Sequence, residues 1–200
     1  MYKVFFNRKY IVLTTKIIEH DEKTPLFYIK YINQNQIISA LKSKKTEGIY
    51  LYHSKEEKLW KHMLKRFPLI EAAGGLVQHQ NGKVLFIYRN KKWDLPKGRI
   101  EKKEMLIDGA VREVCEETGV KDLIVKKNLT HTFHVFSRNG NYKLKKTYWY
   151  LMTTPYDGVL EPQLDEGISL AEWKTKEEIS GLMENAYENI KLLLKEEGLY

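Results

Sequence analysis

The sequence has few of the features that mark membrane-spanning, secreted or zinc-binding proteins. It contains no uninterrupted run of about 18 apolar residues, so we expect no membrane span. Residues 1–15 carry scattered charges in place of a continuous apolar segment, so we expect no secretory signal there. Cys115 is the single cysteine, which excludes an internal disulfide and predicts a cytoplasmic setting. No set of Cys and His residues has the spacing of a zinc site.

The composition is that of a globular protein, with 42% hydrophobic and 30% charged residues in a chain of 200. The net charge of +8 is unevenly placed. Residues 1–68 hold 14 Lys and Arg against 6 Asp and Glu, whereas residues 69–200 hold 20 of each. This shift predicts two units with different surfaces. The basic excess has two interpretations, which are solubility and attraction of phosphate-bearing partners, and the sequence lacks a nucleic-acid motif that would favour the second.

Residues 1–68 are predicted to form a small α+β unit of unknown role. Gln34–Lys44 has apolar residues at helical spacing. Ser54 and Glu57 form a possible capping box before a second helix that ends near Arg66. Three roles are open for this unit: it forms a homodimer, shapes a substrate pocket or binds an unrelated partner. The predicted strands are Lys3–Phe6, Tyr10–Thr14, Leu26–Tyr31 and Gly48–His53.

Residues 69–200 are predicted to form a second, α/β domain. Asn81-Gly82 and Asn139-Gly140 each separate two β-rich runs, which is typical of hairpin turns with both residues at positive φ. Thr175–Glu197 has the apolar periodicity of one amphipathic helix, and Thr175 with Glu178 forms its predicted capping box.

A helix that begins near Met105 and ends at Gly119 carries the most informative pattern. One arc of this helix is apolar, and the other is rich in acids. Glu113 lies one turn before Glu116 and Glu117, where like charges repel and the helix dipole disfavours acids. A hard divalent cation such as Mg²⁺ or Mn²⁺ would relieve both penalties, because carboxylate oxygens are its preferred ligands.

The spacing of residues across Gly98–Val120 resembles a complete Nudix box. The resemblance implies an α/β/α Nudix sandwich with a mixed sheet over about residues 69–200, and it does not cover residues 1–68. It further implies an enzyme that hydrolyses a diphosphate bond in a nucleoside diphosphate derivative, with water as nucleophile and Mg²⁺ or Mn²⁺ as cofactor. The fixed residues of the box are Gly98, Glu104, Arg112, Glu113, Glu116, Glu117 and Gly119.

The resemblance also implies a role for each residue of the box. The metal ligands would be Glu113, Glu116 and Glu117, with the backbone carbonyl of Lys97 as a further ligand. Arg112 would hold Glu113 in place through a charge-assisted hydrogen bond. The role of Glu104 would be to bind the metal through water or to anchor the same network. Gly98 would let the loop approach the metal closely.

The general base and the substrate are less well defined by the box. Glu113 is the preferred base, and Asp165 and Glu166 are alternatives on a late loop. Arg89 and Arg99 lie near the box and Lys146 lies beside a hairpin, so all three are candidate ligands of substrate phosphates. Trp93 is a candidate for stacking on a base, and Tyr148 and Trp149 are weighed with it.

Two features of the sequence bear on the substrate class, and neither identifies a particular substrate. The stretch Trp93–Gly98 is similar to the lead-in of diadenosine polyphosphate and diphosphoinositol polyphosphate hydrolases. The proline typical of ADP-ribose-cleaving members is replaced by Val135 and Phe136, and the tyrosine typical of dinucleoside polyphosphate members by Ser137. A small nucleotide-type substrate is expected. One alternative is trimming of RNA 5′ ends on a basic platform of residues 1–68, and another is a non-catalytic Nudix-like ligand sensor.

Overall fold

The computed structural model describes residues 1–200 and divides the chain into two compact units. Unit 1 consists of Met1–Ile70 and Phe133–Lys145, and unit 2 of Glu71–Thr132 and Lys146–Tyr200. Unit 1 holds 17 Lys and Arg against 6 Asp and Glu, and unit 2 holds 17 against 20. The formal charges are therefore +11 and −3, so the basic excess is concentrated in unit 1 even more than the sequence indicates. No helix is long and apolar enough to cross a membrane.

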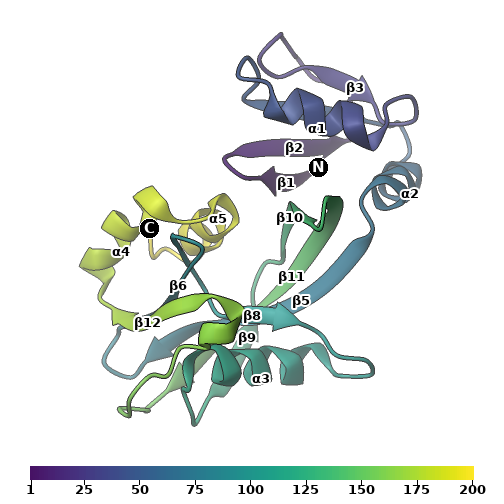
Figure 1. The fold of residues 1–200 in the computed structure, drawn as a ribbon. Helices are drawn as coiled ribbons and strands as arrows, with labels where there is room; N and C mark the ends of the chain where they lie inside the picture. Colours follow the sequence, from purple (N-terminus) through teal and green to yellow (C-terminus); the bar gives the residue numbers. More distant parts are fainter. The chain divides into compact units, whose positions relative to one another are not determined.

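Unit 1 is a mixed sheet with two helices (Figure 1). Its strand order is β10-β1-β2-β4-β3, in which only the β1–β2 pair is antiparallel. Its core is made by Ile11 and Leu13 of the sheet together with Ile37 and Leu41 of the first helix and Met63 of the second. The strands are β1 (Tyr2–Phe6), β2 (Lys9–Thr14), β3 (Leu26–Tyr28), β4 (Gly48–Tyr52) and most of β10 (Thr132–Arg138), and the helices are α1 (Gln34–Lys42) and α2 (Glu56–Arg66).

The hairpin segment Phe133–Lys145 belongs to unit 1, although the sequence places it in the second domain. The reason is strand pairing, because β10 runs parallel to β1 with Val4 opposite Phe133. Phe133, Val135 and Leu144 are buried in the core of unit 1. The division after Ile70 lies close to the boundary expected at residue 68.

Unit 2 is a sheet with helices on both faces (Figure 1). Its strand order is β12-β6-β5-β11, and three short strands attach to the sides of this path. The strands are β5 (Leu69–His79), β6 (Val84–Arg89), β7 (Lys92–Asp94), β8 (Lys97–Arg99), β9 (Ile124–Asn128), β11 (Asn141–Thr154) and β12 (Ile168–Lys174). The helices are α3 (Leu106–Thr118), α4 (Lys176–Leu182) and α5 (Glu188–Glu196), with the short 3₁₀ helices η1 (Leu164–Glu166) and η2 (Met183–Asn185).

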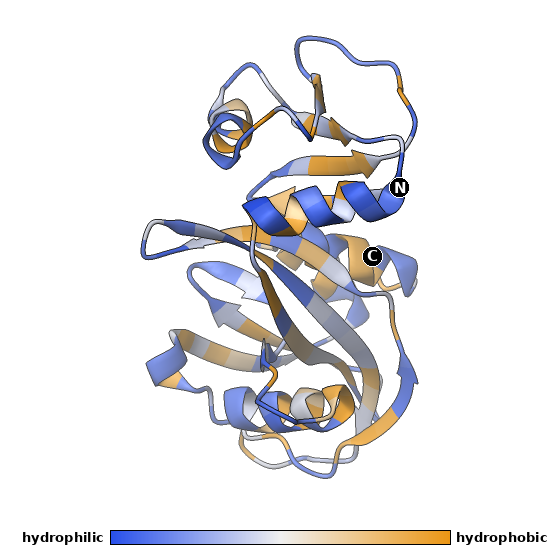
Figure 2. Ribbon diagram, turned by 90° about the vertical axis from the view of Figure 1, so that its right-hand side faces the viewer, coloured by the Kyte–Doolittle hydropathy of each residue, from blue (hydrophilic) through white to orange (hydrophobic).

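Alternation along the strands of unit 2 separates two apolar cores. Leu85 and Tyr150 point to the face covered by α3, where they pack with Ala110. Phe86 and Trp149, their neighbours in sequence, point to the face covered by α4 and α5. The predicted α/β/α sandwich is confirmed by this arrangement. In Figure 2 the helices carry hydrophilic and hydrophobic residues side by side, as expected of amphipathic covers.

The predicted C-terminal helix is wrong in one respect, because the structure interrupts it. Its capping box forms as expected, with Thr175 accepting from the Glu178 amide and Glu178 from the Thr175 amide. The interruption comes at Ala186, which has extended backbone and forms a β-bridge with Trp93. Asn185 donates a side-chain hydrogen bond to the carbonyl oxygen of Lys91 at 2.7 Å. These tertiary contacts override the helical periodicity.

Two further local predictions are wrong, and a third is confirmed. The helix α2 begins after Lys55 without a side-chain cap, so the predicted Ser54 capping box is absent. The Lys55 amide donates instead to His53 Nδ1. At Asn81-Gly82 only the glycine has positive φ, whereas Asn139 and Gly140 both do, at 51° and 76°. The second turn is therefore the predicted type.

Gly119 is confirmed as the residue that ends the acidic helix. Its φ of 72° is left-handed, and its amide donates to the Cys115 carbonyl oxygen at 2.8 Å. A Cβ at this position would lie 3.0 Å from the backbone nitrogen of Glu161. The end of the helix is thus fixed by both backbone conformation and packing.

We predict that Gly119→Ala lowers the free energy of unfolding by about 1–2 kcal/mol, because alanine resists the left-handed conformation. Urea denaturation measures the change. The control is Gly181→Ala in α4, where a Cβ meets nothing within 4 Å and should stabilise the helix by about 0.5–1 kcal/mol. Equal stabilities of the two variants would contradict the prediction.

Candidate active site

The last two turns of α3 bring three carboxylates to one end of unit 2. The apolar side of the helix is anchored by Ala110 and Val114, which are fully buried, and this orients the acidic side. The side chain of Glu116 is 50% exposed, that of Glu113 12% and that of Glu117 only 1%. The acids on the expected polar face therefore differ in exposure. Glu116 is in contact with solvent, and Glu117 lies in the protein interior.

Arg112 connects this acidic group through its guanidinium. Its Nε and Nη2 form a fork with the two carboxylate oxygens of Glu104, at 2.7 and 2.9 Å. Its Nη1 donates to Glu113 Oε1 and to Glu116 Oε2, each at 2.8 Å. Its Nη2 also donates to the carbonyl oxygen of Arg99 at 3.1 Å. The number of these bonds equals the five N–H donors of a guanidinium, so the group is fully used.

Glu104 anchors Arg112 from the loop before α3. The fork with Arg112, together with a hydrogen bond from the Glu101 amide at 2.8 Å, lowers the pKa of Glu104 to about 2. The same network raises the pKa of the Arg112 guanidinium, chiefly through Glu104. Glu104 is therefore the anchor of the network in this structure, which is one of the two roles expected for it.

Glu117 is enclosed beneath β8. Its Oε2 accepts a hydrogen bond from the backbone amide of Lys97 at 2.7 Å, and its Oε1 accepts one from Arg89 Nη1 at 3.3 Å. Burial raises the pKa of Glu117 to about 7, although the charges of Lys97 and Arg89 act in the opposite direction. The carboxylate thus lies in a site that favours an additional positive charge.

Lys97 uses its side chain and its backbone differently. Its buried ammonium pairs with Asp94 Oδ2 at 2.6 Å, so this side chain is directed to a protein partner. Asp94 also accepts the Leu95 amide at 2.8 Å, which stiffens the turn between β7 and β8. This buried pair was not predicted, although the i,i+3 spacing of Asp94 and Lys97 in the sequence is a signal that could have indicated it.

Gly98 leaves room for the carboxylate of Glu113. It lies in β8 opposite Ala73, and a Cβ at this position would be 1.6 Å from Glu113 Oε2. Burial raises the pKa of Glu113, while Arg112 opposes the shift. The absence of a side chain at Gly98 is therefore required for this carboxylate to lie against the backbone of β8.

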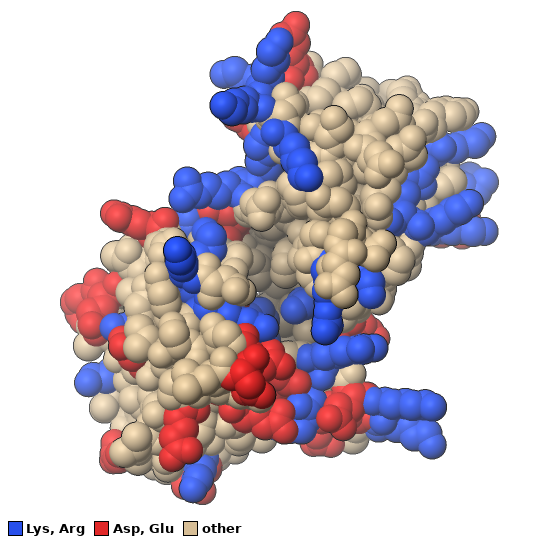
Figure 3. All heavy atoms as spheres, viewed as in Figure 1, with Lys and Arg blue, Asp and Glu red and all other residues tan.

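A cleft of about 520 Å³ opens beside these groups. Acidic and basic side chains are interleaved in the region of α3 and β8 (Figure 3). The cleft is lined by four acids and three basic residues, and of the basic residues Arg99 and Lys102 are able to contact phosphate oxygens. Its lining residues are Arg99, Ile100, Glu101, Lys102, Arg112, Glu113, Glu116, Gln163 and Glu166. Lys102 and Gln163 were missed in the sequence, where nothing in their spacing marks them.

Of the other predicted site residues, some line the cleft and others do not. Glu166 lines the cleft and accepts from Arg89 Nη2 at 3.0 Å, whereas Asp165 is not among the lining residues. Arg89, expected to bind substrate phosphates, instead bridges Glu166 and Glu117. Lys146 lies with its ammonium 4.4 Å from the ring centroid of Tyr148, away from the cleft lining.

The aromatic residues weighed for base stacking are engaged within the protein. The ring of Trp93 packs against Tyr88 with 5.0 Å between centroids, and Lys174 covers it at 5.0 Å. Trp149 is 1% exposed and donates to Thr132 Oγ1, so it belongs to the core. Of the candidates for stacking, Trp149 is therefore excluded, because alternation along β11 turns this side chain inward.

The acids of α3 have the donor chemistry of a hard divalent cation. All their donors are carboxylate oxygens, the missing side chain of Gly98 leaves room for Glu113, and Glu117 is fully buried. Glu113 and Glu116 turn toward Arg112 and Glu117 toward the Lys97 amide, so no three acidic, His or Cys side chains converge on one point. The residues fit a cation in type; in this structure Glu113 and Glu116 contact the guanidinium of Arg112, and Glu117 contacts that of Arg89.

Comparison with known proteins assigns the chain to a family. The family model described as the NUDIX domain matches residues 68–195. The chain belongs to the NUDIX family. This confirms the resemblance inferred from Gly98–Val120, and the matched range covers nearly all of unit 2 together with the hairpin of unit 1.

Relatives of the NUDIX domain are known from sequence and from structure. An RNA pyrophosphohydrolase of Bartonella tribocorum is 32% identical over 82 residues, which are 36% of this chain and 47% of that protein. The chain thus spans about half the length of this curated relative. The C. elegans Ap4A hydrolase in a binary complex has a TM-score of 0.51 at 19% identity, covering 63% of this chain and 93% of that one.

A second solved structure gives the same picture of the fold. The MutT protein of Methanosarcina mazei Go1 has a TM-score of 0.51 at 22% identity, and the match covers 65% of this chain and 93% of that one. At such identities the two structures show a shared fold, which confirms the predicted NUDIX architecture.

The anchoring role of Glu104 predicts a pH-dependent contribution to stability. Glu104→Gln should lower the free energy of unfolding at pH 7 by about 1–3 kcal/mol, since it removes a charged hydrogen-bond partner. The pKa of Glu104 is about 2 in the folded protein and lies near 4.3 in an unfolded chain. The carboxylate therefore stabilises the fold fully above pH 4.3, and this contribution is lost as the pH falls through 2.

Urea unfolding at pH 7, 5, 4 and 3 measures the difference between Glu104→Gln and the unsubstituted protein. The difference should be constant between pH 7 and 5 and should shrink below pH 4. Glu101→Gln serves as the control, because Glu101 is exposed and only its backbone amide bonds to Glu104. A constant difference down to pH 3 would show that ionised Glu104 is not the stabilising form.

Proposed function

We propose that the protein hydrolyses a diphosphate bond in a nucleoside diphosphate derivative, with Mg²⁺ or Mn²⁺ as cofactor. The observation that carries the proposal is the group of Glu113, Glu116 and Glu117 at the end of α3, beside a cleft that also presents Arg99 and Lys102. The NUDIX family match and the relatives named pyrophosphohydrolase and Ap4A hydrolase support it. A cytoplasmic location and a homodimer stay predictions.

Glu113, Glu116 and Glu117 would hold the cation, with the carbonyl of Lys97 as a possible fourth donor. A divalent cation supplies neutralisation of diphosphate charge and lowers the pKa of a water molecule. Arg112 keeps Glu113 and Glu116 close together by binding both through Nη1. Arg99 and Lys102, on the wall of the cleft, would bind the outer phosphate oxygens of the substrate.

The chemical step needs one proton acceptor. The oxygen of water bonds to phosphorus, the bridging P–O bond breaks, and the proton of water passes to a carboxylate. Glu113 suits this role, because it lines the cleft and burial raises its pKa, which makes it a stronger proton acceptor. Glu166 is the alternative, as it also lines the cleft, whereas Asp165 does not.

A second candidate function is hydrolysis at the 5′ end of RNA. The curated relatives at 26–33% identity are named RNA pyrophosphohydrolase, which favours this substrate class. The charge of +11 on unit 1 also favours a polyanion. The intact set of acids speaks against the non-catalytic sensor considered from the sequence.

The activity is tested with a panel of ADP-ribose, diadenosine polyphosphates, NADH, nucleotide sugars, nucleoside triphosphates and RNA with a 5′ triphosphate. We expect metal-dependent release of products cut at a diphosphate bond from at least one member. Glu113→Gln should lower kcat by about 10²–10⁴-fold if Glu113 is the base. Glu166→Gln should then leave kcat within about tenfold. The reverse order would assign the base to Glu166, and no turnover of any member would contradict the proposed class.

The cofactor is tested by calorimetry with Mn²⁺ and with Mg²⁺. The unsubstituted protein should bind the ion, and the double variant Glu113→Gln, Glu117→Gln should lose about tenfold or more in affinity because two charged donors are removed. Glu184→Gln is the control, since Glu184 is an exposed acid of η2 that lies outside the cleft. Equal heats for all three proteins would show that α3 is not the ion-binding element.

A further inference from the structure

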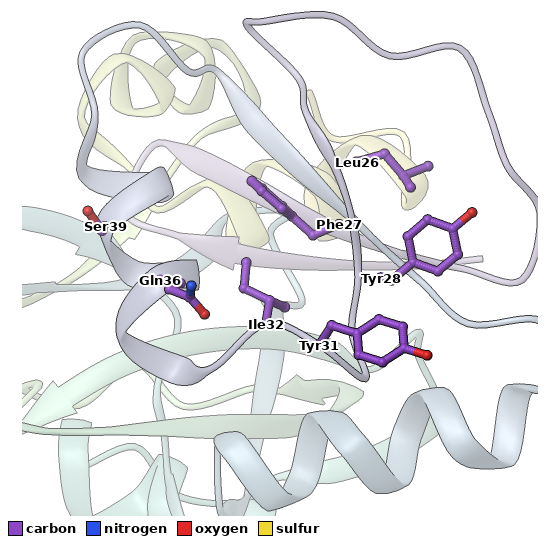
Figure 4. Close-up of a pocket in the computed structure, with 7 residues that line it drawn as sticks. All are labelled: Leu26, Phe27, Tyr28, Tyr31, Ile32, Gln36 and Ser39. Carbon is purple, nitrogen blue, oxygen red and sulfur yellow. The ribbon is translucent and has the colours of Figure 1, made fainter.

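Unit 1 contains an open cavity that the hydrolytic site does not explain. Its volume is about 570 Å³, and it lies between the strand β3, the turn that follows it and the helix α1 (Figure 4). Phe27, Tyr28 and Tyr31 give it an aromatic wall. Gln36 and Ser39, from α1, place polar atoms on another wall. Such a mixture of ring faces and amide or hydroxyl groups suits a flat, polar-edged ligand.

The two tyrosines of this wall are unusually exposed for large aromatic side chains. Tyr28 is 49% and Tyr31 76% accessible to solvent, and both rings project to the same side of the turn (Figure 4). Aromatic residues exposed close together point to an interaction surface, whereas single exposed ones need no explanation. The apolar rings therefore define a surface that a ligand would cover.

The turn that carries the rings is held in place by the rest of unit 1. The Tyr31 amide donates to the Tyr28 carbonyl oxygen at 3.0 Å, and between them Ile29 is fully buried. Arg66 of α2 donates from Nε to the carbonyl oxygen of Ile32 at 2.6 Å. Because the backbone of the turn is fixed before any ligand arrives, binding does not have to order this segment of the chain.

The charge of unit 1 favours an anionic ligand. Unit 1 carries +11, and Figure 3 shows Lys and Arg atoms bordering an uncharged surface in the region of α1 and β3. The ammonium of Lys30 lies 5.2 Å from the ring centroid of Tyr31. Positive charge beside exposed aromatic rings is the combination that holds single-stranded nucleic acids, because phosphates contact the cations while bases stack on the rings.

We propose that this cavity binds a base of a single-stranded nucleic acid, stacked against Tyr28 and Tyr31, with the adjoining phosphates near Lys30. Gln36 and Ser39 would contact the polar edge of the base. The site lies wholly within unit 1 and is separate from the carboxylates of α3. It therefore goes beyond the proposed hydrolysis, and it can be tested without turnover.

Fluorescence anisotropy with a labelled 12-nucleotide RNA that bears a 5′ hydroxyl measures the binding. Such an RNA has no diphosphate bond, so failure to bind is distinct from failure of the hydrolytic proposal. The double variant Tyr28→Ala, Tyr31→Ala should bind about tenfold more weakly or worse, because stacking contacts are lost. Tyr200→Ala is the matched control, since Tyr200 is 53% exposed and lies in unit 2. Circular dichroism checks that the variants stay folded.

Two comparisons separate stacking from charge. An abasic strand of equal length should bind the unsubstituted protein as weakly as the intact RNA binds the double variant. Lys30→Gln should weaken RNA binding more than Lys61→Gln, a control on the exposed side of α2. A labelled acidic peptide should bind weakly and without dependence on Tyr28. RNA affinity that is unchanged in the double variant, equal for the abasic strand, or exceeded by that of the peptide would overturn the proposal.

Discussion

The arrangement of acids in the candidate site depends on their contacts with the guanidinium of Arg112. Three glutamates surround it, and two of them stand near the C-terminal end of α3, where the helix dipole disfavours negative charge. The third, Glu104, ties the loop before α3 to the same group. One cation thus offsets repulsion within the helix and sets the position of the loop at the same time.

Glu117 adds a constraint of a different kind, since its carboxylate lies in the interior. Its partners, Arg89 and Lys97, come from β6 and β8, so Glu117 connects the end of α3 to these two strands. Arg89 extends this connection to Glu166 on η1. A change at Glu117 therefore alters the packing of unit 2, and a change at Arg89 also removes the cation that pairs with Glu166 in the cleft.

Much of this site was predictable because it depends on spacing along a single helix. The periodicity that buries Val114 fixes where Glu113 and Glu117 point, and Gly119 marks the end of the helix by its conformation. The carboxylate contacts of Arg89 were not predictable from the sequence, because its partners Glu117 and Glu166 lie 28 and 77 residues away along the chain. Trp93 illustrates the same limit, since Lys174, which covers its ring, is distant from it in sequence.

In the fold, too, features set by local sequence were predictable, whereas features set by contacts with distant segments were not. Helices α1 and α3 follow from apolar spacing, and the left-handed turn at Asn139-Gly140 follows from residue type. The break at Ala186 and the membership of Phe133 in unit 1 depend on pairing with distant strands, which local patterns do not record.

The discontinuous make-up of unit 1 limits how this protein is able to be divided. A shortened chain that begins at Glu71 would retain the hairpin but lose β1 and the core around it. Phe133, Val135 and Leu144 would then face water, and the exposed edge of β10 would invite self-association. Residues 1–70 are therefore not removable without loss of structure elsewhere. A transfer of unit 1 to a related protein would need both of its sequence segments, Met1–Ile70 and Phe133–Lys145.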